Sequence, residues 1–265
     1  MKQKTVLITG GSSGIGFEIS KIFAANNFHI VWVSLMENEL KSAQENLLKI
    51  YPNNKIDFLC KDLSSSDAAQ EVYNWIKENK WEIDVLINNA GFGVYGYTFE
   101  NDLDKEVAMI QLNVVSLFKL TKLFLKDMIL KNDGIIINIS SNSSFQPVVR
   151  MNVYASTKAF VTHFSKGLQE ELTLIKSKVK VMTVCPAAIK DTAFKKVGNM
   201  EKVKTFDGLA ATTAKEVAND VWKAYKNKKT FVVSGWKMRW LYFLSPIIPY
   251  ALQQYMVNIE TKEKL

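Results

Sequence analysis

The sequence predicts an α/β fold built on a doubly wound parallel sheet. Short apolar runs rich in Val and Ile alternate with longer segments whose apolar residues recur at helical spacing. Such alternation is typical of βαβ units, whose strands lie parallel and are buried on both faces. A glycine-rich turn also follows the first apolar run, where a strand would pass into a helix. The 265 residues fit one α/β domain of ordinary size.

We expect seven strands and six helices in the sheet-forming part of the chain. The expected strands are residues 4–9, 29–34, 55–60, 83–88, 134–140, 179–185 and 230–234. The expected helices are residues 14–26, 37–50, 66–79, 102–130, 152–177 and 214–227. No linker or internal repeat divides the chain, so we expect one domain over residues 1–235 and a C-terminal helical extension over residues 236–265.

The run TGGSSGIG at residues 9–16 is suited to binding a dinucleotide. Gly10 allows a tight turn, Gly14 lets the backbone approach a pyrophosphate, and Gly16 lets the next helix lie close to the sheet. Backbone N–H groups and the positive end of the helix dipole would then face the phosphates. A glycine-rich turn without a ligand is the alternative for this motif alone.

The segment YASTK at residues 154–158 places a phenol and an ammonium four residues apart. Within a helix, Tyr154 and Lys158 would therefore share one face. A free tyrosine titrates near pH ~10 and is a poor base at neutral pH. The ammonium, together with the positive charge of an oxidised nicotinamide, would favour the phenolate and lower the pKa of Tyr154. Taken alone, the pair is also a common pair on helix surfaces.

Further motifs lie at consistent places along the chain. NNAG at residues 88–91 ends a strand, Asn113 lies in the helix that follows, and Ser141 lies thirteen residues before Tyr154. With these motifs, residues 4–235 resemble the short-chain dehydrogenase/reductase family. The resemblance implies a Rossmann-like fold and an NAD(P)-dependent oxidoreductase that interconverts carbonyl compounds and alcohols by hydride transfer. Three longer stretches around the same motifs resemble a DltE-like group of bacterial reductases.

The resemblance implies four catalytic residues. Tyr154 would be the general acid in reduction, and Lys158 would lower its pKa and bind the nicotinamide ribose. Ser141 would donate to the substrate carbonyl oxygen, and Asn113 would hold a water that links Lys158 to solvent. Three neighbouring serines are alternatives to Ser141 by composition alone, and only the spacing selects among them: Ser140, Ser143 and Ser144.

The resemblance also implies which residues contact the dinucleotide. They are Gly10, Ser12, Ser13, Gly14, Ile15, Gly16, Ser34, Asp62, Leu63, Asn89, Ala90, Gly91, Tyr154, Lys158, Pro186, Ile189 and Thr192. Two positions depart from the family pattern. Pro186 is followed by Ala187 rather than by Gly, and Thr192 stands one residue later than the threonine that contacts phosphate.

The end of the second expected strand bears on the choice between NADP and NAD. NAD users of the family carry an acid near position 35 and many NADP users carry an arginine, whereas this chain has Leu35. Without an acid, nothing there repels a 2′-phosphate. The side chains that could bond such a phosphate are Ser12, Ser13, Ser34 and Asn38. Glu37 reaching the ribose hydroxyls is the alternative, so we favour NADPH and leave NAD open.

We expect a reductase of a hydrophobic or medium-sized carbonyl compound. A 3-oxoacyl reductase and a hydroxysteroid or bile-acid dehydrogenase are alternatives, and so is a dinucleotide-binding regulatory protein without activity. The four catalytic residues favour an enzyme, because a regulatory protein does not need all of them. Specificity is expected to lie in loops near residues 92–97, 142–151 and 190–212.

The net charge of +8 is compatible with an anionic cofactor, substrate or membrane. Lysines are interspersed with acids and form no basic helix of the groove-reading kind, which disfavours nucleic acid as a partner. Cys60 and Cys185 lie in apolar strand ends and are expected to be buried free thiols of a cytoplasmic protein, with no metal site. We expect a homodimer or homotetramer that acts on a small molecule.

Residues 236–257 are apolar and aromatic, and Lys237 and Arg239 lie among them. A spanning helix needs ~20 apolar residues, and two prolines and two glutamines break this run, so we do not expect it to cross a bilayer. Trp and Tyr beside basic residues suit peripheral contact with a membrane. A lid over the substrate pocket or a dimer contact is the alternative, which the sequence slightly favours.

Overall fold

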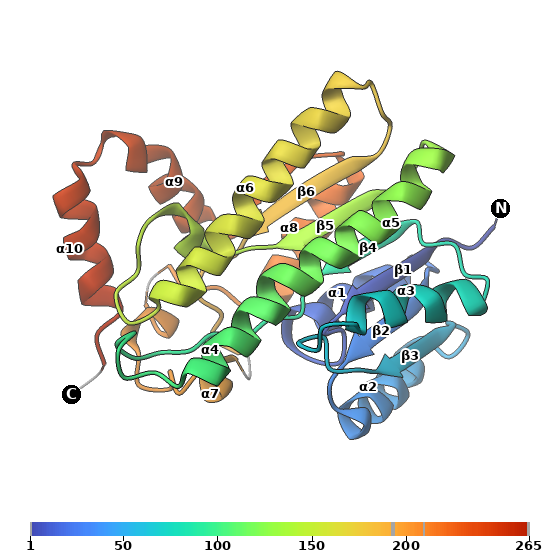
Figure 1. Cartoon of the computed structure of the whole chain (residues 1–265), viewed down its shortest axis with the longest axis horizontal. Coiled ribbons are helices and arrows are strands. Elements are labelled where there is room, and N and C mark those ends of the chain that lie inside the picture. Colours follow the sequence, from blue (N-terminus) through green and yellow to red (C-terminus); the bar gives the residue numbers. More distant parts are fainter. Residues whose placement is uncertain (1, 192–193, 209, 264–265) are drawn as a thin grey trace.

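The computed structural model describes residues 2–191, 194–208 and 210–263, and its centre is a seven-stranded sheet (Figure 1). The strands are β1 (Thr5–Thr9), β2 (His29–Ser34), β3 (Ile56–Cys60), β4 (Val85–Asn88), β5 (Ile135–Ile139), β6 (Lys180–Cys185) and β7 (Phe231–Val233). Their order is β3-β2-β1-β4-β5-β6-β7, and every neighbouring pair is parallel. The predicted doubly wound parallel sheet is confirmed. Strand order reverses at β1 and β4, where such sheets bind ligands.

Helices cover both faces of the sheet (Figure 1). They are α1 (Gly14–Ala25), α2 (Glu37–Ile50), α3 (Ala68–Glu78), α4 (Leu103–Ile110), α5 (Leu117–Lys131), α6 (Asn152–Leu174), α7 (Phe194–Val197), α8 (Ala214–Lys226), α9 (Trp236–Leu244) and α10 (Tyr250–Glu260). Residues of α1, α2 and α8 pack on one face, and residues of α3, α5 and α6 pack on the other.

The two-residue period of β1 explains this layering. All five of its residues are buried; Val6 and Ile8 join the core on the α1 side, whereas Leu7 joins the core on the α3 side. A parallel strand buried on both faces consists mainly of apolar and β-branched residues, as the sequence TVLIT of β1 does. The result is a rigid sheet whose strand ends hold the site.

The expected helix over residues 102–130 is interrupted. Between α4 and α5, residues Gln111–Ser116 form a π-helix that contains Asn113. A π turn inserts one residue into the helical repeat, and such turns occur frequently at functional sites. The whole run Leu103–Lys131 is long and apolar enough to cross a membrane by length and composition alone. In the fold its α5 part packs against α3 and β4.

The expectation of two buried thiols is wrong for one of them. Cys185 is buried, but Cys60 is exposed, and its thiol donates to the Leu35 carbonyl at 3.1 Å. Cys60 ends β3, which is the edge strand of the sheet, so its side chain lacks a neighbouring strand on one side.

After β7 the chain forms a helical hairpin of α9 and α10, here named the tail hairpin, at the opposite end of the molecule from the N-terminus (Figure 1). Side-chain contacts hold it against the body. The Tyr242 ring lies 4.6 Å from the Phe145 ring between centroids, and the Tyr95 hydroxyl donates to the Thr261 carbonyl at 2.8 Å. Gln253 braces the turn by donating to the carbonyls of Ser245 and Ile248, each at 2.7 Å.

Candidate active site

The glycine turn after β1 forms a tight cradle. Gly10 and Gly14 have φ values of +64° and +51°, a region that side-chain-bearing residues rarely adopt. A Cβ at Gly16 would lie 2.2 Å from the Gly10 carbonyl oxygen, so only glycine fits there. Ser13 caps α1 in an extended conformation without a side-chain hydrogen bond to the helix, and the first turn of α1 has no acid. Its N–H groups are therefore available to a phosphate, and the cradle fits a dinucleotide.

The NNAG motif locks this cradle to the neighbouring strand. Asn89 donates from Nδ2 to the carbonyls of Thr9 and Gly10, each at 3.0 Å. The Thr9 hydroxyl accepts from the backbone N–H groups of Asn89 and Ala90, each at 3.0 Å. The motif thus holds the turn in shape across the reversal of strand order.

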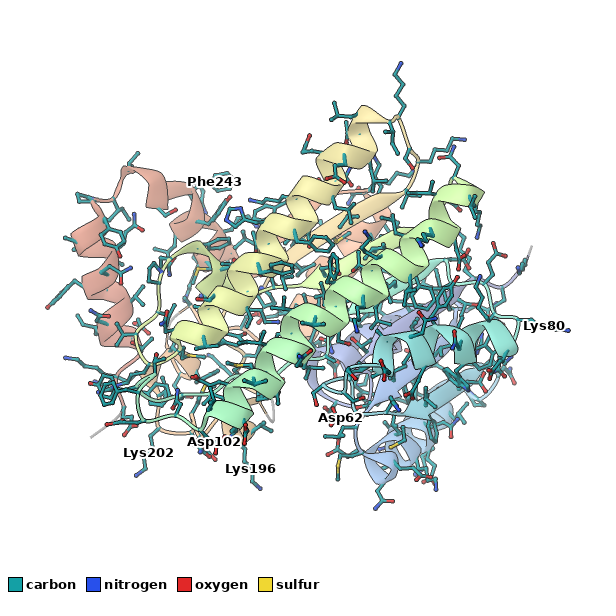
Figure 2. All side chains as sticks on the ribbon, viewed as in Figure 1. Asp62, Lys80, Asp102, Lys196, Lys202 and Phe243 are labelled. Carbon is teal, nitrogen blue, oxygen red and sulfur yellow. The ribbon has the colours of Figure 1, made fainter. Side chains whose placement is uncertain are left out.

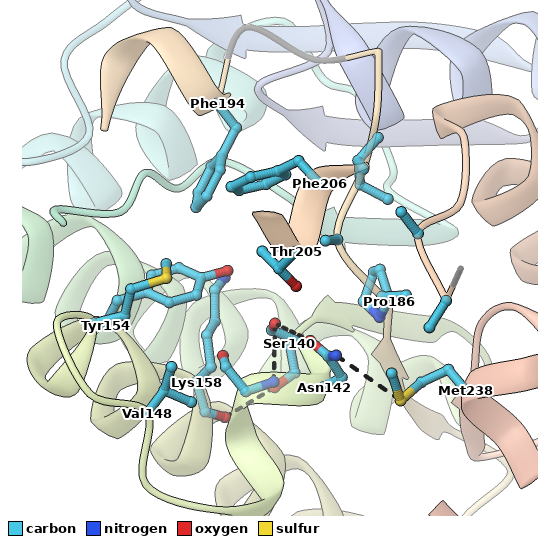
Figure 3. Close-up of a pocket in the computed structure, with 18 of the residues that line it drawn as sticks. Ser140, Asn142, Val148, Tyr154, Lys158, Pro186, Phe194, Thr205, Phe206 and Met238 are labelled. Carbon is cyan, nitrogen blue, oxygen red and sulfur yellow. Dashed lines mark hydrogen bonds between the residues drawn. The ribbon is translucent and has the colours of Figure 1, made fainter. Parts of the chain in front are cut away.

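Tyr154 and Lys158 lie one turn apart on α6 and are both buried, with exposed fractions of 8% and 5%. The Lys158 Nζ lies 5.8 Å from the centroid of the Tyr154 ring and donates to the Ile139 carbonyl at the end of β5, at 3.0 Å. Figure 3 shows the two side chains reaching together into the cavity. The strand end thus fixes the ammonium beside the phenol.

Burial controls the ionisation of this pair. Removal from water raises the pKa of Tyr154 to about 12, and hydrogen bonding with Ser141 acts in the opposite direction. Removal from water lowers the pKa of Lys158 to about 8. The expected lowering of the tyrosine pKa is therefore not found, because desolvation outweighs the hydrogen bond with Ser141. At neutral pH Tyr154 keeps its proton.

The four serines after β5 differ in their hydrogen bonds. Ser140 and Ser144 belong to a buried network around Thr162, at 2.7 and 2.9 Å from its hydroxyl oxygen. Ser141 lies on the cavity wall, accepts from the backbone N–H of Ser143 at 3.2 Å and donates to the Asn142 side chain at 3.2 Å. The network therefore occupies the hydroxyls of Ser140 and Ser144, whereas Ser141 lies outside it. Ser140 and Ser143 line the cavity as well.

Asn113 lies behind the pair rather than on the cavity wall. Its Nδ2 donates to the Phe92 carbonyl at 2.9 Å and to the Thr157 hydroxyl at 3.2 Å. A Cβ at Gly91 would lie 2.8 Å from the Asn113 Oδ1 and 3.4 Å from the Lys158 Nζ. Asn113 and Lys158 therefore approach the same glycine from two sides, and the π-helix carries Asn113 into this position.

One cavity of about 610 Å³ joins the cradle to the Tyr154 side. Most of the predicted cofactor residues line it: Gly10, Ser13, Gly14, Ile15, Asn89, Ala90, Gly91, Tyr154, Lys158, Pro186 and Ile189. Gly16 lies beneath the turn.

Four other predicted contacts do not line the cavity: Ser12, Ser34, Asp62 and Leu63. Ser12 and Ser34 form a hydroxyl pair at 3.0 Å. Asp62 is exposed at the surface (Figure 2) and accepts from the backbone N–H of Ser64 at 2.8 Å, whereas Leu63 is buried in the core. Thr192 lies outside the described residues. Across residues 2–191, 194–208 and 210–263, no cluster of three or more His, Cys, Asp and Glu side chains could hold a metal ion.

The rest of the cavity wall is mostly apolar. It comes from the loop before α6, from the segment around α7, and from the tail hairpin (Figure 3). Sequence reasoning did not assign individual tail residues to the wall. The signal was present, because Met238, Leu241, Tyr242 and Ser245 line the cavity at a spacing of three, four and seven residues along one helix face.

Comparisons with known proteins agree with this geometry. The short chain dehydrogenase family model matches residues 4–202. A probable NADP-dependent dehydrogenase of Haemophilus influenzae is 30% identical over 83% of this chain and 87% of that protein. A very-long-chain 3-oxoacyl-CoA reductase of Rattus norvegicus is 35% identical over 62% of this chain. The match covers 53% of that protein's length. The structure of a short-chain dehydrogenase from Sphingobium yanoikuyae in complex with NADPH is 26% identical in sequence and has a TM-score of 0.80. The match covers 99% of this chain and 98% of that chain.

The chain therefore belongs to the short-chain dehydrogenase family. It is an oxidoreductase that works with a nicotinamide dinucleotide.

Proposed function

We propose that the protein reduces an apolar, bulky carbonyl compound to the alcohol and uses NADPH. One observation carries this proposal: buried Tyr154 and Lys158 stand between the glycine cradle and a mostly apolar cavity of about 610 Å³. Apolar atoms form most of that cavity wall, so apolar contacts would hold the molecule and leave its carbonyl for Tyr154 and Ser141.

In this mechanism each side chain has one task. Ser141 donates to the carbonyl oxygen and stabilises the charge that develops there. Tyr154 enters the reaction protonated, because its pKa is about 12, and gives its proton to the same oxygen. The ammonium of Lys158 stabilises the phenolate that remains, and Asn113 positions the Gly91 segment against Lys158. The bound cofactor supplies the hydride.

NADPH is favoured over NADH by the surroundings of β2. Leu35 is 58% exposed where NAD users of the family carry an acid. Glu37, the alternative contact to a ribose, instead pairs with Lys41 at 2.7 Å along α2. The relative from Haemophilus influenzae and the structure from Sphingobium yanoikuyae are also described with NADP and NADPH. The hydroxyl pair of Ser12 and Ser34 supports this choice, because both groups could donate to a 2′-phosphate.

The test is the oxidation of NADPH, followed by its absorbance, across a panel of ketones and aldehydes of increasing size. The proposal expects turnover with bulky apolar ketones and a tenfold or larger preference for them over small polar ones, which is ~1.4 kcal/mol. Tight NADPH binding without turnover of any carbonyl would instead indicate a dinucleotide-binding regulatory protein.

A 3-oxoacyl reductase is the second candidate, because the relative from Rattus norvegicus bears that name. A hydroxysteroid or bile-acid dehydrogenase would suit the same apolar cavity. Acyl thioesters and steroid ketones in the panel separate these substrates, because each would give the highest kcat/KM if it were the natural class.

Three finer assignments are part of the proposal. The motifs around residues 88, 113 and 154 support a DltE-like reductase. The free thiols support a cytoplasmic site of action. Half-exposed Phe118 and Phe160, on α5 and α6, support a homodimer or homotetramer through that face, which sedimentation velocity tests.

A further inference from the structure

The tail hairpin exposes several large apolar side chains. Six of them are 63% to 78% exposed and are here named the tail surface: Trp236, Trp240, Phe243, Ile247, Tyr250 and Tyr255. Phe243 stands at the periphery of the molecule in Figure 2. Scattered single apolar residues are normal on a surface, but six large ones within one short hairpin favour an interaction site.

The helix α9 has two different apolar faces. Met238, Leu241 and Tyr242 lie on the cavity wall. Trp236, Trp240 and Phe243 recur at four and seven residues on the other face and are exposed. An α-helix with its side chains is ~10 Å thick, so one helix separates the cavity from the tail surface.

The charge around the tail surface is positive. Residues 236–258 contain Lys237 and Arg239 and no Asp or Glu. The Lys237 Nζ lies 5.6 Å from the centroid of the Trp236 ring. The Arg239 guanidinium lies 3.8 Å from the Asp220 carboxylate, and about half of the Arg239 side chain is exposed. The Lys166 Nζ lies 4.0 Å from the centroid of the Phe231 ring. The first acids of the tail, Glu260 and Glu263, follow at its end. This charge suits an anionic partner.

The dimensions of the hairpin favour contact with a bilayer surface over spanning. The nine residues of α9 and the eleven of α10 measure about 14 and 17 Å along their axes. A hydrocarbon core is ~30 Å thick, so neither helix can cross it. Aromatic residues beside basic residues are typical of helices that lie in the headgroup region.

We propose that the tail surface docks the protein on an anionic phospholipid bilayer, with α9 and α10 lying in the headgroup region. A second copy of the chain has another apolar face available, on α5 and α6 around Phe118 and Phe160. That face carries no Trp beside basic residues, whereas the tail surface does. The bilayer is therefore the occupant that matches the chemistry of the tail surface.

If the protein docks in this orientation, its substrate comes from the bilayer. This step rests on the proposed function. The cavity lies one helix away from the lipid, and its wall in the tail is apolar. An apolar carbonyl compound dissolved in the bilayer would reach the cavity past α9 without crossing water. The substrate class is then a membrane-soluble ketone or aldehyde.

The test is co-sedimentation of the full chain with phosphatidylcholine vesicles, with and without phosphatidylglycerol. Binding is expected only to the anionic vesicles at low salt, with release in about 1 M NaCl, where the Debye length is ~3 Å. Trp240→Glu combined with Phe243→Glu should lower the bound fraction at least tenfold, because two inserted side chains become charged. Lys237→Gln should lower affinity about fivefold, the effect of losing one cation near an anionic surface.

A matched control introduces the same two charges far from the tail. Leu130 and Leu174, at the ends of α5 and α6, are 86% and 82% exposed, and Leu130→Glu with Leu174→Glu should leave vesicle binding unchanged. Neither double variant touches the cavity wall, so turnover of a water-soluble ketone should match wild type in both. Turnover of a long-chain ketone supplied in vesicles should fall only in the tail variant.

Wild-type protein that remains in the supernatant with anionic vesicles at low salt would overturn the proposal. The proposal would also be overturned if the tail variant and the wild type bound vesicles equally. It would be overturned as well if the wild type were a dimer and the tail variant a monomer, because the tail surface would then be a contact between copies of the chain. The proposed function fails separately: absence of carbonyl turnover alongside anionic vesicle binding would refute the reductase and retain the docking surface.

Discussion

The ammonium of Lys158 lies 5.8 Å from the ring centroid of Tyr154, one helical turn along α6, and is fixed there by the Ile139 carbonyl at 3.0 Å. The two groups respond to burial in opposite ways. The phenol holds its proton more tightly and the ammonium releases its proton more easily. This arrangement suits a proton donor at neutral pH whose conjugate base is stabilised by a neighbouring cation.

Replacing Tyr154 by Phe removes the hydroxyl and little volume, so the fold and NADPH binding should persist. Turnover should fall by ~10² or more, the usual effect of losing a positioned general acid. Steady-state NADPH oxidation and the quenching of intrinsic fluorescence by NADPH measure the two properties. A variant that binds NADPH and reduces the best ketone at the wild-type rate would contradict the proposed role of Tyr154.

The pH dependence of reduction should follow Lys158. Its pKa is lowered to about 8, so the positive charge is present below that pH and is lost as the pH rises through it. Tyr154 stays protonated over this range, since its pKa is about 12. The value of kcat/KM for the ketone should therefore fall above pH ~8, because this parameter reports ionisation of the free enzyme.

Lys158→Arg is the matched variant for this pH profile. A guanidinium stays charged throughout the range, so the fall above pH ~8 should disappear even if the larger group lowers the rate. An unchanged alkaline fall in Lys158→Arg would assign the ionisation to another group.

The fold and the strand-end motifs could be predicted because they depend on local patterns. The burial of β1 follows from its five apolar or β-branched residues, and the cradle follows from Gly10, Gly14 and Gly16. Parallel strands end at one edge of a sheet, so the motifs after β1, β4 and β5 had to converge. The spacing to Tyr154 selected Ser141, which lines the cavity together with Ser140 and Ser143, so its catalytic role stays a prediction.

Other features depend on tertiary packing and could not be predicted. The π turn around Asn113 has an ordinary helical composition, so periodicity does not distinguish it from α-helix. The raised pKa of Tyr154 depends on how deeply α6 is buried, which spacing does not report. The exposure of Cys60 depends on the place of β3 at the sheet edge. The wall formed by α9 depends on the direction in which the chain turns after β7.

Leu35→Asp should move cofactor preference from NADPH toward NADH. The new carboxylate would repel a 2′-phosphate at this exposed strand end and could bond the ribose hydroxyls of NADH. The ratio of kcat/KM for NADPH to that for NADH should fall at least tenfold, or ~1.4 kcal/mol. Glu37→Gln is the control and should leave the ratio unchanged, because Glu37 pairs with Lys41. A wild type that already prefers NADH would remove the basis of this prediction.

Gly16→Ala should destabilise the protein and weaken NADPH binding, whereas Gly167→Ala should stabilise the protein. A Cβ at Gly16 would meet the Gly10 carbonyl oxygen at 2.2 Å and Asn89 Nδ2 at 2.7 Å, so the cradle must distort and NADPH affinity should fall at least tenfold. A Cβ at Gly167 on α6 meets nothing within 4 Å, so this change should stabilise the protein by ~0.5–1 kcal/mol. Thermal unfolding and NADPH titration measure both variants. Equal affinity for NADPH in Gly16→Ala and wild type would place the pyrophosphate elsewhere.

Leu241→Trp should narrow the substrate range without affecting the chemistry. Leu241 lines the cavity from α9, and the larger indole would occupy part of its 610 Å³. KM for bulky ketones should rise about tenfold or more, while KM for a small aldehyde and the affinity for NADPH stay within twofold, because the cradle and Tyr154 are untouched. Leu244→Trp is the matched control on the same helix: Leu244 is 44% exposed and does not line the cavity, so every substrate should behave as in wild type. Measuring kcat and KM for both substrates in the three proteins decides the matter. If Leu241→Trp binds bulky ketones as well as wild type does, α9 is not part of the substrate wall, and the substrate must lie nearer to Phe206.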